Sequence, residues 1–354
     1  MGDVTIRTTA DATPPADVDM TADLAGVVVS DPVFTASGCA AAGRELAPYN
    51  DLRAIGGVVT KSIQLTPRSG RPTPRMAETP SGMLNSIGLQ GPGIDVFLDH
   101  DLRWLADNDI RAVVSIAGSS VEDYAKLASR LRGQPAALIE VNISCPNVED
   151  RGQVFACDAN AAGAVIAAVR RSAPSGVPVF AKLSPDVTDI VDIAQACINA
   201  GANGLSLINT TLGIVVDTTT MRPVLAGVTG GLSGPAIRPL ALRCVWQVHA
   251  AMPQVPIMGI GGIRTGLDAL EFVLAGASAV QVGTVIFNDP SAPTRISREL
   301  RIALAERGID RLADAVGLAH RPPVVTVPEE PDPPGDELLE PVVPRPVSFE
   351  EASP

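Results

Sequence analysis

Short apolar runs recur along most of the chain, and they contain many β-branched residues with little polar alternation. This pattern is typical of strands that are covered on both faces, as in a parallel sheet. We therefore predict eight buried parallel strands, at residues 33–37, 55–61, 112–117, 137–143, 178–183, 204–209, 255–260 and 278–283.

Amphipathic helical patterns separate these runs, and some begin with a clear start signal, such as Ser119 and Ser120 ahead of Glu122. The clearest helical patterns cover residues 119–132, 158–172, 188–200, 235–251, 266–275 and 291–307. Strands that alternate with helices over about 250 residues predict an α/β fold, the TIM (β/α)8 barrel. An open doubly wound sheet is the alternative, because periodicity alone does not separate the two folds.

Two connections, residues 62–93 and 210–233, are much longer than the others and are rich in Gly, Pro, Thr and Arg. Long loops inside a compact domain usually serve binding or catalysis. Both connections follow a predicted strand, so we expect them to lie as long βα loops over the C-terminal mouth of the barrel, where this fold carries its chemistry.

The acidic charge is concentrated at the end of the chain. The whole chain has a net charge of −12, and residues 321–354 contribute half of it, with eight acidic residues against two arginines. The same stretch contains ten of the 31 prolines. We predict a flexible N-terminal segment at 1–20, the barrel at 21–320 and a disordered, acidic, Pro-rich tail at 321–354.

Composition also limits the partners. The negative average field disfavours nucleic acid, and only 3% of the residues are aromatic, too few for base-stacking surfaces. No apolar run reaches 18 residues and the N-terminus has no signal-peptide core, so we predict a cytoplasmic chain without membrane contact. The five cysteines form no CxxC pair, and we predict reduced thiols and no metal site.

Lysines and glycines lie where predicted strands end. Lys61 and Lys182 end two strands, while Gly261-Gly262 and Gly283-Thr284 follow the last two. Glycines at these positions are typical of a phosphate-binding site, although each turn could be an ordinary tight turn. A single lysine at a strand end is usually a rim residue. Two lysines across one barrel mouth favour a flat, electron-accepting ring such as a flavin.

Cys145 is our candidate for proton chemistry, because it directly follows a strand and asparagines flank it. A thiol titrates near ~8.5, so modest tuning makes it a base at neutral pH. The ordinary alternative is a buried apolar cysteine, which we assign to Cys39, Cys157, Cys197 and Cys244. Asparagine both donates and accepts hydrogen bonds, which suits a pyrimidine-dione; the candidates are Asn85, Asn142, Asn147 and Asn209.

Nine stretches carry a resemblance to a known family: TASGCAAAG (35–43), TKSIQLTPRSGRPTPRMAE (60–78), GMLNSIGLQGPG (82–93), VNISCPN (141–147), AKLSPDVTDI (181–190), GLSLINT (204–210), TGGLSGPAIRPLALR (229–243), MGIGGI (258–263) and ALEFVLAGASAVQVGT (269–284). Together they resemble the class 1 dihydroorotate dehydrogenases, most closely the class 1B catalytic subunit. The resemblance spans about residues 22–310.

The resemblance implies a TIM barrel with FMN at its mouth that oxidises dihydroorotate to orotate in de novo pyrimidine biosynthesis. Cys145 matches the base that takes the C5 proton while a hydride passes from C6 to flavin N5, and Lys61 is the second expected catalytic residue. The expected substrate contacts are Lys61, Asn85, Ser86, Ile87, Gly88, Leu89, Asn142, Asn147, Asn209 and Thr210. The expected FMN contacts are Ser37, Lys61, Ser62, Ser115, Asn142, Lys182, Ile208, Gly234, Gly261, Gly262, Gly283 and Thr284.

The same resemblance implies a homodimer. Class 1B chains also need an electron-transfer subunit that carries FAD and a [2Fe–2S] cluster and passes electrons to NAD⁺, whereas class 1A enzymes reduce fumarate. This chain shows no dinucleotide-binding fingerprint or cluster cysteines of its own. The electron acceptor therefore stays open at this point.

Three features depart from the family pattern: Arg71, Ser115 and the stretch VEDRGQVFACD (148–158). The last of these bears on loop closure and substrate choice. One alternative is a related FMN barrel that acts on another dihydropyrimidine-like substrate. A phosphate-binding lyase or isomerase would leave Lys182 and Cys145 without a role, and a scaffold acting through the acidic tail would not need them.

Overall fold

The computed structural model describes residues 18–143 and 155–322. The chain divides into two units, Met1–Arg321 and Pro322–Pro354. Nearly all of the predicted flexible N-terminal segment and acidic tail lies outside the described residues, as do Cys145 and Asn147. The fold below is that of the first unit.

Eight parallel strands close into a barrel in the order β10-β15-β16-β3-β4-β7-β8-β9. Their bounds are β3 (Val33–Thr35), β4 (Gly57–Val59), β7 (Ala112–Ile116), β8 (Leu138–Asn142), β9 (Val179–Leu183), β10 (Gly204–Leu207), β15 (Ile257–Ile260) and β16 (Ala279–Val282). Every residue of these strands is buried, because the strands face the barrel interior on one side and helices on the other. The eight predicted strands and the barrel are thereby confirmed, and the open sheet is excluded.

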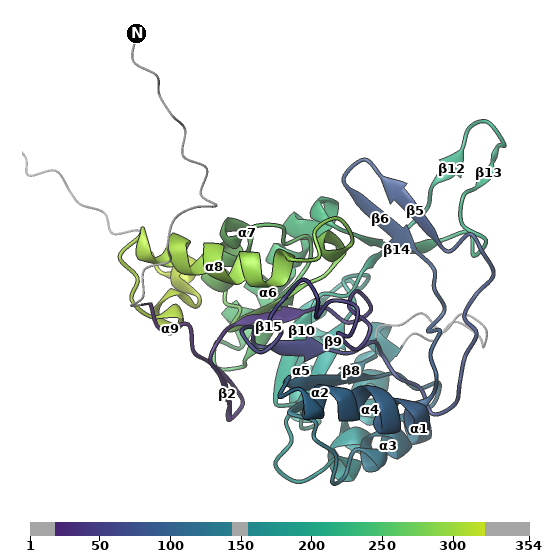
Figure 1. Ribbon diagram of the computed structural model, residues 1–354, viewed down its shortest axis with the longest axis horizontal. Helices are drawn as coiled ribbons and strands as arrows, with labels where there is room; N and C mark the ends of the chain where they lie inside the picture. The colour runs from purple at the N-terminus through teal and green to yellow at the C-terminus, as the bar shows by residue number, and fades with distance from the viewer. Residues whose placement is uncertain (1–17, 144–154, 323–354) are drawn as a thin grey trace, which may run out of the picture. The chain divides into compact units, whose positions relative to one another are not determined.

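Six predicted helices are present: α3 (Val121–Arg130), α4 (Ala159–Ser172), α5 (Ile190–Asn199), α6 (Arg238–Ala251), α7 (Gly266–Leu274) and α8 (Ala292–Ala305). The first five connect barrel strands, and α8 follows the last strand, β16. They surround the strands in Figure 1. Side chains cap several of them. Ser120 accepts a hydrogen bond from the Asp123 backbone N–H, and Thr265 and Asp268 form a reciprocal capping box.

Several elements were not predicted. An N-terminal hairpin, β1 (Ala22–Leu24) and β2 (Val27–Val29), precedes β3. A helical segment lies between β4 and β7 and consists of α1 (Ile94–Val96), a π-helical stretch (Phe97–Leu102) and α2 (Arg103–Asp107). Short helical pieces complete the unit at Phe155–Cys157, Thr284–Phe287, α9 (Leu312–Ala315) and Leu318–His320. A further short piece, Pro235–Ile237, lies within the helix predicted at 235–251.

The two long connections pair with each other instead of forming separate loops. Strands β5 (Met76–Thr79) and β6 (Gly82–Asn85) of the first join β11 (Thr211–Gly213) and β14 (Gly230–Ser233) of the second in one antiparallel sheet, ordered β11-β14-β6-β5. The hairpin β12 (Val216–Asp217) and β13 (Arg222–Pro223) extends beyond this sheet (Figure 1). We call the four strands the mouth sheet, because the connections that form it leave the C-terminal ends of β4 and β10.

Glycine 204, the first residue of β10, allows a close approach inside the barrel wall. A Cβ atom there would lie 2.4 Å from the ring of Phe180, which is fully buried. Gly163 in α4 is the opposite case, since its added Cβ would meet nothing nearer than Ala196 O at 3.6 Å.

We therefore expect Gly204→Ala to destabilise the protein by about 1–3 kcal/mol through overpacking. Gly163→Ala is the matched control, and it should be neutral or stabilising by up to about 1 kcal/mol, because alanine is the better helix former. Urea unfolding measures both changes. A Gly204→Ala variant as stable as the wild type would contradict the packing argument.

The end of the first unit is held against α6 by a cluster of aromatic rings. The His320 ring stacks on Trp246, with centroids 3.6 Å apart, and lies 4.9 Å from the His249 ring. The His249 ring contacts bare backbone, since an added Cβ would come within 2.1 Å of it at Gly276 and within 2.3 Å at Gly317.

Burial, followed by the charge of His320, lowers the pKa of His249 below its ordinary value of 6.5. The unfolded chain then binds more protons than the folded chain just below pH 6.5, so stability falls as the pH falls through that window. We expect the free energy of unfolding to decrease from pH 7.5 to pH 5.5, and to decrease less in His249→Gln. Identical pH profiles for the two proteins would refute this assignment.

Candidate active site

The C-terminal ends of the parallel strands bring predicted site residues together at one end of the barrel. Ser62 is the centre of a hydrogen-bonded group there. Its Oγ lies 3.3 Å from Ser37 Oγ and 2.9 Å from Ser115 Oγ, and it accepts a hydrogen bond of 3.0 Å from Asn142 Nδ2. Asn209 Nδ2 in turn donates to Asn142 Oδ1 at 3.4 Å. Five strands or strand ends thus contribute to one polar network.

Lys182 lies beside this network, because β8 and β9 pair Asn142 with Lys182 in register. Its ammonium is buried, with 5% of the side chain exposed, and forms an ion pair of 3.3 Å with the fully buried Glu140. Gln281 Nε2 donates to the other carboxylate oxygen of Glu140 at 2.8 Å. The sequence reading missed Glu140 and Gln281. A charged residue in the middle of an apolar strand was the available signal, since such residues are buried only with partners.

The glycines after β15 and β16 pack closely against neighbouring protein atoms. An added Cβ at Gly262 would lie 2.6 Å from Gly234 O, and one at Gly261 would lie 2.5 Å from the Ala241 Cβ. Gly261 and Gly262 have φ values of +143° and +70°, which residues other than glycine rarely adopt. Thr284 donates from its Oγ1 to Ser233 Oγ at 2.8 Å. The end of β15 therefore packs against the turn after β14, and the end of β16 contacts β14 through Thr284.

The predicted substrate segment, residues 85–89, begins at the end of β6. Asn85 Nδ2 donates to Gly231 O on β14 at 3.4 Å. Arg71, which we noted as a departure from the family pattern, donates from Nη1 to Ser86 Oγ at 3.2 Å and from its backbone to Ile87 O at 3.0 Å. Gly88 and Leu89 follow with positive φ values of 76° and 54°. Arg71 therefore helps to fix the conformation of residues 85–89 through these two hydrogen bonds.

The remaining predicted residues that the structure describes lie at the same end of the barrel. Lys61 is half-buried directly after β4, Ile208 is buried after β10, and the Thr210 backbone N–H donates to Asn209 Oδ1 at 2.9 Å. Cys145 and Asn147 lie outside the described residues, so their predicted roles stay predictions.

Cys39, which we assigned to the apolar core, lies at the mouth. Its Sγ would be 3.3 Å from a Cβ at Gly283. Burial raises the pKa of its thiol to about 11, and the charges of Lys182 and Lys61 only partly oppose this. Cys39 is therefore a neutral thiol close to both lysines.

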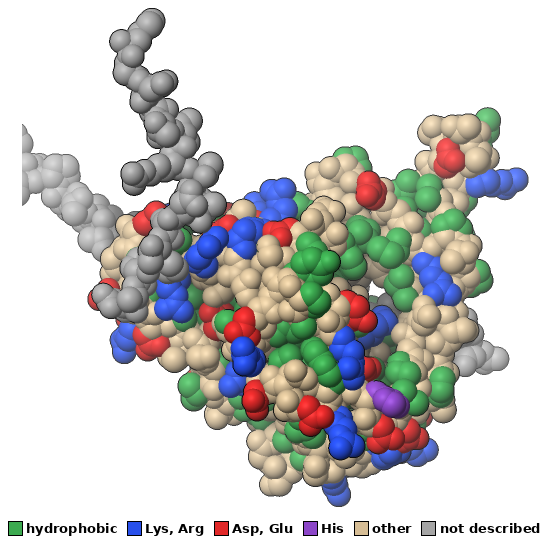
Figure 2. Space-filling model, in the orientation of Figure 1, with side chains coloured by type: hydrophobic (Ala, Val, Ile, Leu, Met, Phe, Trp, Pro, Cys, Tyr) green, Lys and Arg blue, Asp and Glu red, His purple; other side chains and the backbone are tan. Residues whose placement is uncertain are grey.

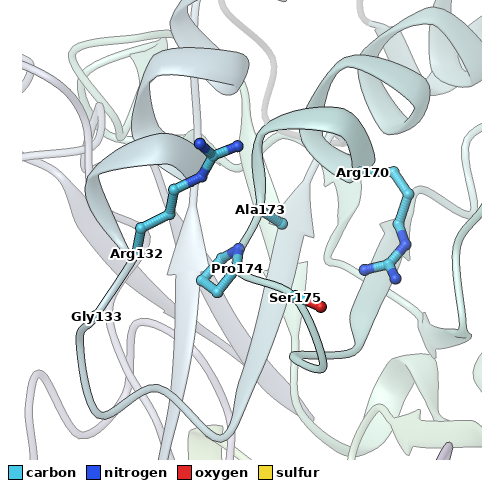
Figure 3. Close-up of a pocket in the computed structure, with 6 residues that line it drawn as sticks. All are labelled: Arg132, Gly133, Arg170, Ala173, Pro174 and Ser175. Atoms are coloured by element: carbon cyan, nitrogen blue, oxygen red, sulfur yellow. The ribbon is translucent and has the colours of Figure 1, made fainter.

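A separate hollow lies at the other end of the barrel, in the connections that lead into β8 and β9 (Figure 3). Its two arginines are already engaged by backbone carbonyls: Arg132 Nε donates to Ser172 O at 2.8 Å and Arg170 Nη1 to Val177 O at 3.2 Å. None of the predicted site residues lines it. Within residues 18–143 and 155–322 there is neither a helix long and apolar enough to cross a membrane nor a cluster of three potential metal ligands.

Comparison with known proteins gives a consistent result. Residues 20–304 match the sequence model of the dihydroorotate dehydrogenase family. The chain is 54% identical over 300 residues to the protein of Pelobacter propionicus named dihydroorotate dehydrogenase B (NAD(+)), catalytic subunit, covering 84% of this chain and 98% of that protein. The protein of the same name from Geotalea daltonii is 51% identical over 303 residues, covering 85% and 98%. A crystal structure of DHODH from Eimeria tenella in complex with ferulenol is similar with a TM-score of 0.71 at 25% identity, covering 88% of this chain and 92% of that one.

The cysteine environments predict an order of alkylation. At pH 8 the Cys39 thiol is protonated, because its pKa is about 11. Burial, followed by the charge of Asp186, also raises the pKa of Cys157, but this thiol is exposed and should be the first of the three to react with iodoacetamide. Cys197, buried with a pKa of about 12, should stay unmodified. Mass spectrometry of peptides over a time course measures the three rates. If Cys39 reacts as fast as Cys157, the two lysines outweigh burial and the assignment is wrong.

Proposed function

The chain belongs to the dihydroorotate dehydrogenase family, and from this we propose that it is the catalytic subunit of an NAD⁺-linked enzyme that uses FMN to oxidise dihydroorotate to orotate in pyrimidine biosynthesis. One observation carries the proposal. The buried ammonium of Lys182 lies beside the Ser62 network at one end of the barrel, in a chain that aligns with 98% of a named catalytic subunit.

The residues at the mouth fit FMN. Phosphate groups bind to backbone N–H groups in glycine turns, such as the positive-φ pair Gly261-Gly262, and a buried cation such as Lys182 suits the negative charge of a reduced flavin. When bound, FMN supplies the acceptor for a hydride. We assign its binding to Ser37, Lys61, Ser62, Ser115, Asn142, Lys182, Ile208, Gly234, Gly261, Gly262, Gly283 and Thr284.

The chain's own residues bind the substrate and move its proton. Amide side chains can pair with the ring N–H and C=O groups, and the Lys61 ammonium can bind negative charge. We assign substrate binding to Lys61, Asn85, Ser86, Ile87, Gly88, Leu89, Asn142, Asn147, Asn209 and Thr210. We further propose that Cys145 Sγ accepts the proton from C5 as the hydride leaves C6. Lys61 is the second proposed catalytic residue.

We also propose two protein partners: a second copy of this chain, and an electron-transfer subunit with FAD and a [2Fe–2S] cluster that reduces NAD⁺. The relatives' name, which includes both NAD(+) and "catalytic subunit", supports the second. Exposed apolar side chains in the long connections offer contact surface, and Figure 2 shows hydrophobic side chains in this region. They are Met76, Leu212, Ile214, Val216, Met221 and Val228.

The test is an anaerobic absorbance titration of the purified chain with dihydroorotate, which should bleach the flavin band. Cys145→Ala should retain FMN but reduce it about 10²–10⁴-fold more slowly, because the base is removed. Cys244→Ala, in α6, is the matched control and should keep the wild-type rate.

Three other outcomes would each reject one part of the proposal. A yellow wild type that dihydroorotate does not bleach would reject this substrate and favour a related dihydropyrimidine. A wild-type rate in Cys145→Ala would reject that residue as the base, and a colourless protein that does not take up FMN would reject the flavin itself.

A further inference from the structure

Glu140 is a buried carboxylate that the proposed chemistry does not use. It lies on β8 with no exposed surface, and its two oxygens have different partners. Lys182 Nζ, from β9, lies 3.3 Å from Oε1, and Gln281 Nε2, from β16, donates to Oε2 at 2.8 Å. Three barrel strands therefore converge on one carboxylate beneath the mouth.

The surroundings of Lys182 leave Glu140 as its counter-charge. A buried ammonium without a nearby negative charge tends to lose its proton, because desolvation disfavours the charged form. Within the described part of the chain, Glu140 is the carboxylate that forms an ion pair with Lys182. The charge of Lys182 also acts on the Cys39 thiol, but that thiol has a pKa of about 11 and is neutral.

Gln281 fixes the carboxylate in place. Its amide donates both to Glu140 and to Met258 Sδ, at 2.8 Å and 3.6 Å. The second carboxylate oxygen of Glu140 is therefore held by Gln281, and the carboxylate cannot turn away from the Lys182 ammonium without losing this hydrogen bond.

We propose that Glu140 is a positioning residue for the flavin reaction: its ion pair holds the Lys182 ammonium at the FMN site, and so sets the reduction potential of the bound flavin. This inference rests on the proposed function, because it requires FMN at the mouth. Glu140 itself need not touch the cofactor.

The test compares Glu140→Gln with the wild type in a reductive titration against a reference dye, which needs no dihydroorotate. Glutamine keeps the shape and removes the charge. We expect a lower flavin potential and weaker FMN binding at pH 8, because the Lys182 ammonium is no longer held at the site. An unchanged or raised potential at pH 8 would overturn the proposal.

Ser206→Ala is the matched control for disturbing the barrel interior. Ser206 is fully buried, pairs in register with Lys182, and its Oγ has no hydrogen-bond partner among the described residues. Its removal should leave the flavin potential at the wild-type value. A fall equal to that of Glu140→Gln would show a general packing effect and overturn the proposal.

A double-mutant cycle separates an effect through Lys182 from a direct effect on the flavin. If Glu140 acts through the lysine, adding Glu140→Gln to Lys182→Gln should leave the potential of the single Lys182→Gln variant unchanged. Additive changes would contradict this. Should Glu140→Gln fail to fold, Glu140→Asp withdraws the charge by one methylene and should lower the potential less. A wild-type potential in Glu140→Asp would then overturn the proposal.

The proposed function and the role of Glu140 are distinguished by how the wild type behaves with FMN and with dihydroorotate. A wild type that binds no FMN overturns the proposed function and this inference with it. A wild type that binds FMN but is not reduced by dihydroorotate rejects the substrate and leaves the role of Glu140 standing.

Discussion

The ion pair between Glu140 and Lys182 places two opposite charges inside a barrel whose walls are otherwise mostly apolar. Removing water from such a pair costs nearly as much free energy as their attraction returns, whereas losing one partner costs about 3–5 kcal/mol. The pair is therefore a poor source of stability but a strong constraint on register. A slip of one residue in β8 or β9 would turn Glu140 or Lys182 to the helix side. The polar network at Asn142 depends on that same register.

Most of the barrel could be predicted because its signals are local. Each strand lies in a short, mainly apolar run, and helices such as α3 begin at capping residues that are visible in the sequence. The segment of α1 and α2 was missed because it lacks such a signal: Gly93 precedes it with a φ of +86° and makes no side-chain cap. The mouth sheet was missed because β6 pairs with β14 across a long sequence separation. No local periodicity reports such a pairing.

Site residues at strand ends could be predicted from the sequence. Residues in the middle of a strand, and residues whose role depends on tertiary contacts, could not. Lys182 and Asn142 were identified by position, and the structure brings them together. Glu140 was read as part of an apolar run. Arg71 could only be seen as a departure until its contact with Ser86 was known. The position of Cys39 near the lysines likewise depends on how the loop after β3 folds back over the mouth.

The mouth sheet also has a consequence for how the protein is made. Met83 on β6 and its partner Ser233 on β14 are 150 residues apart. A ribosome adds about 5–20 residues per second, so about 8–30 s pass between the synthesis of the two strands. During that time the hairpin of β5 and β6 has been made but its second neighbour has not. The mouth sheet therefore cannot be completed until β14 has been made, and until then the edge of β6 is open to wrong pairing.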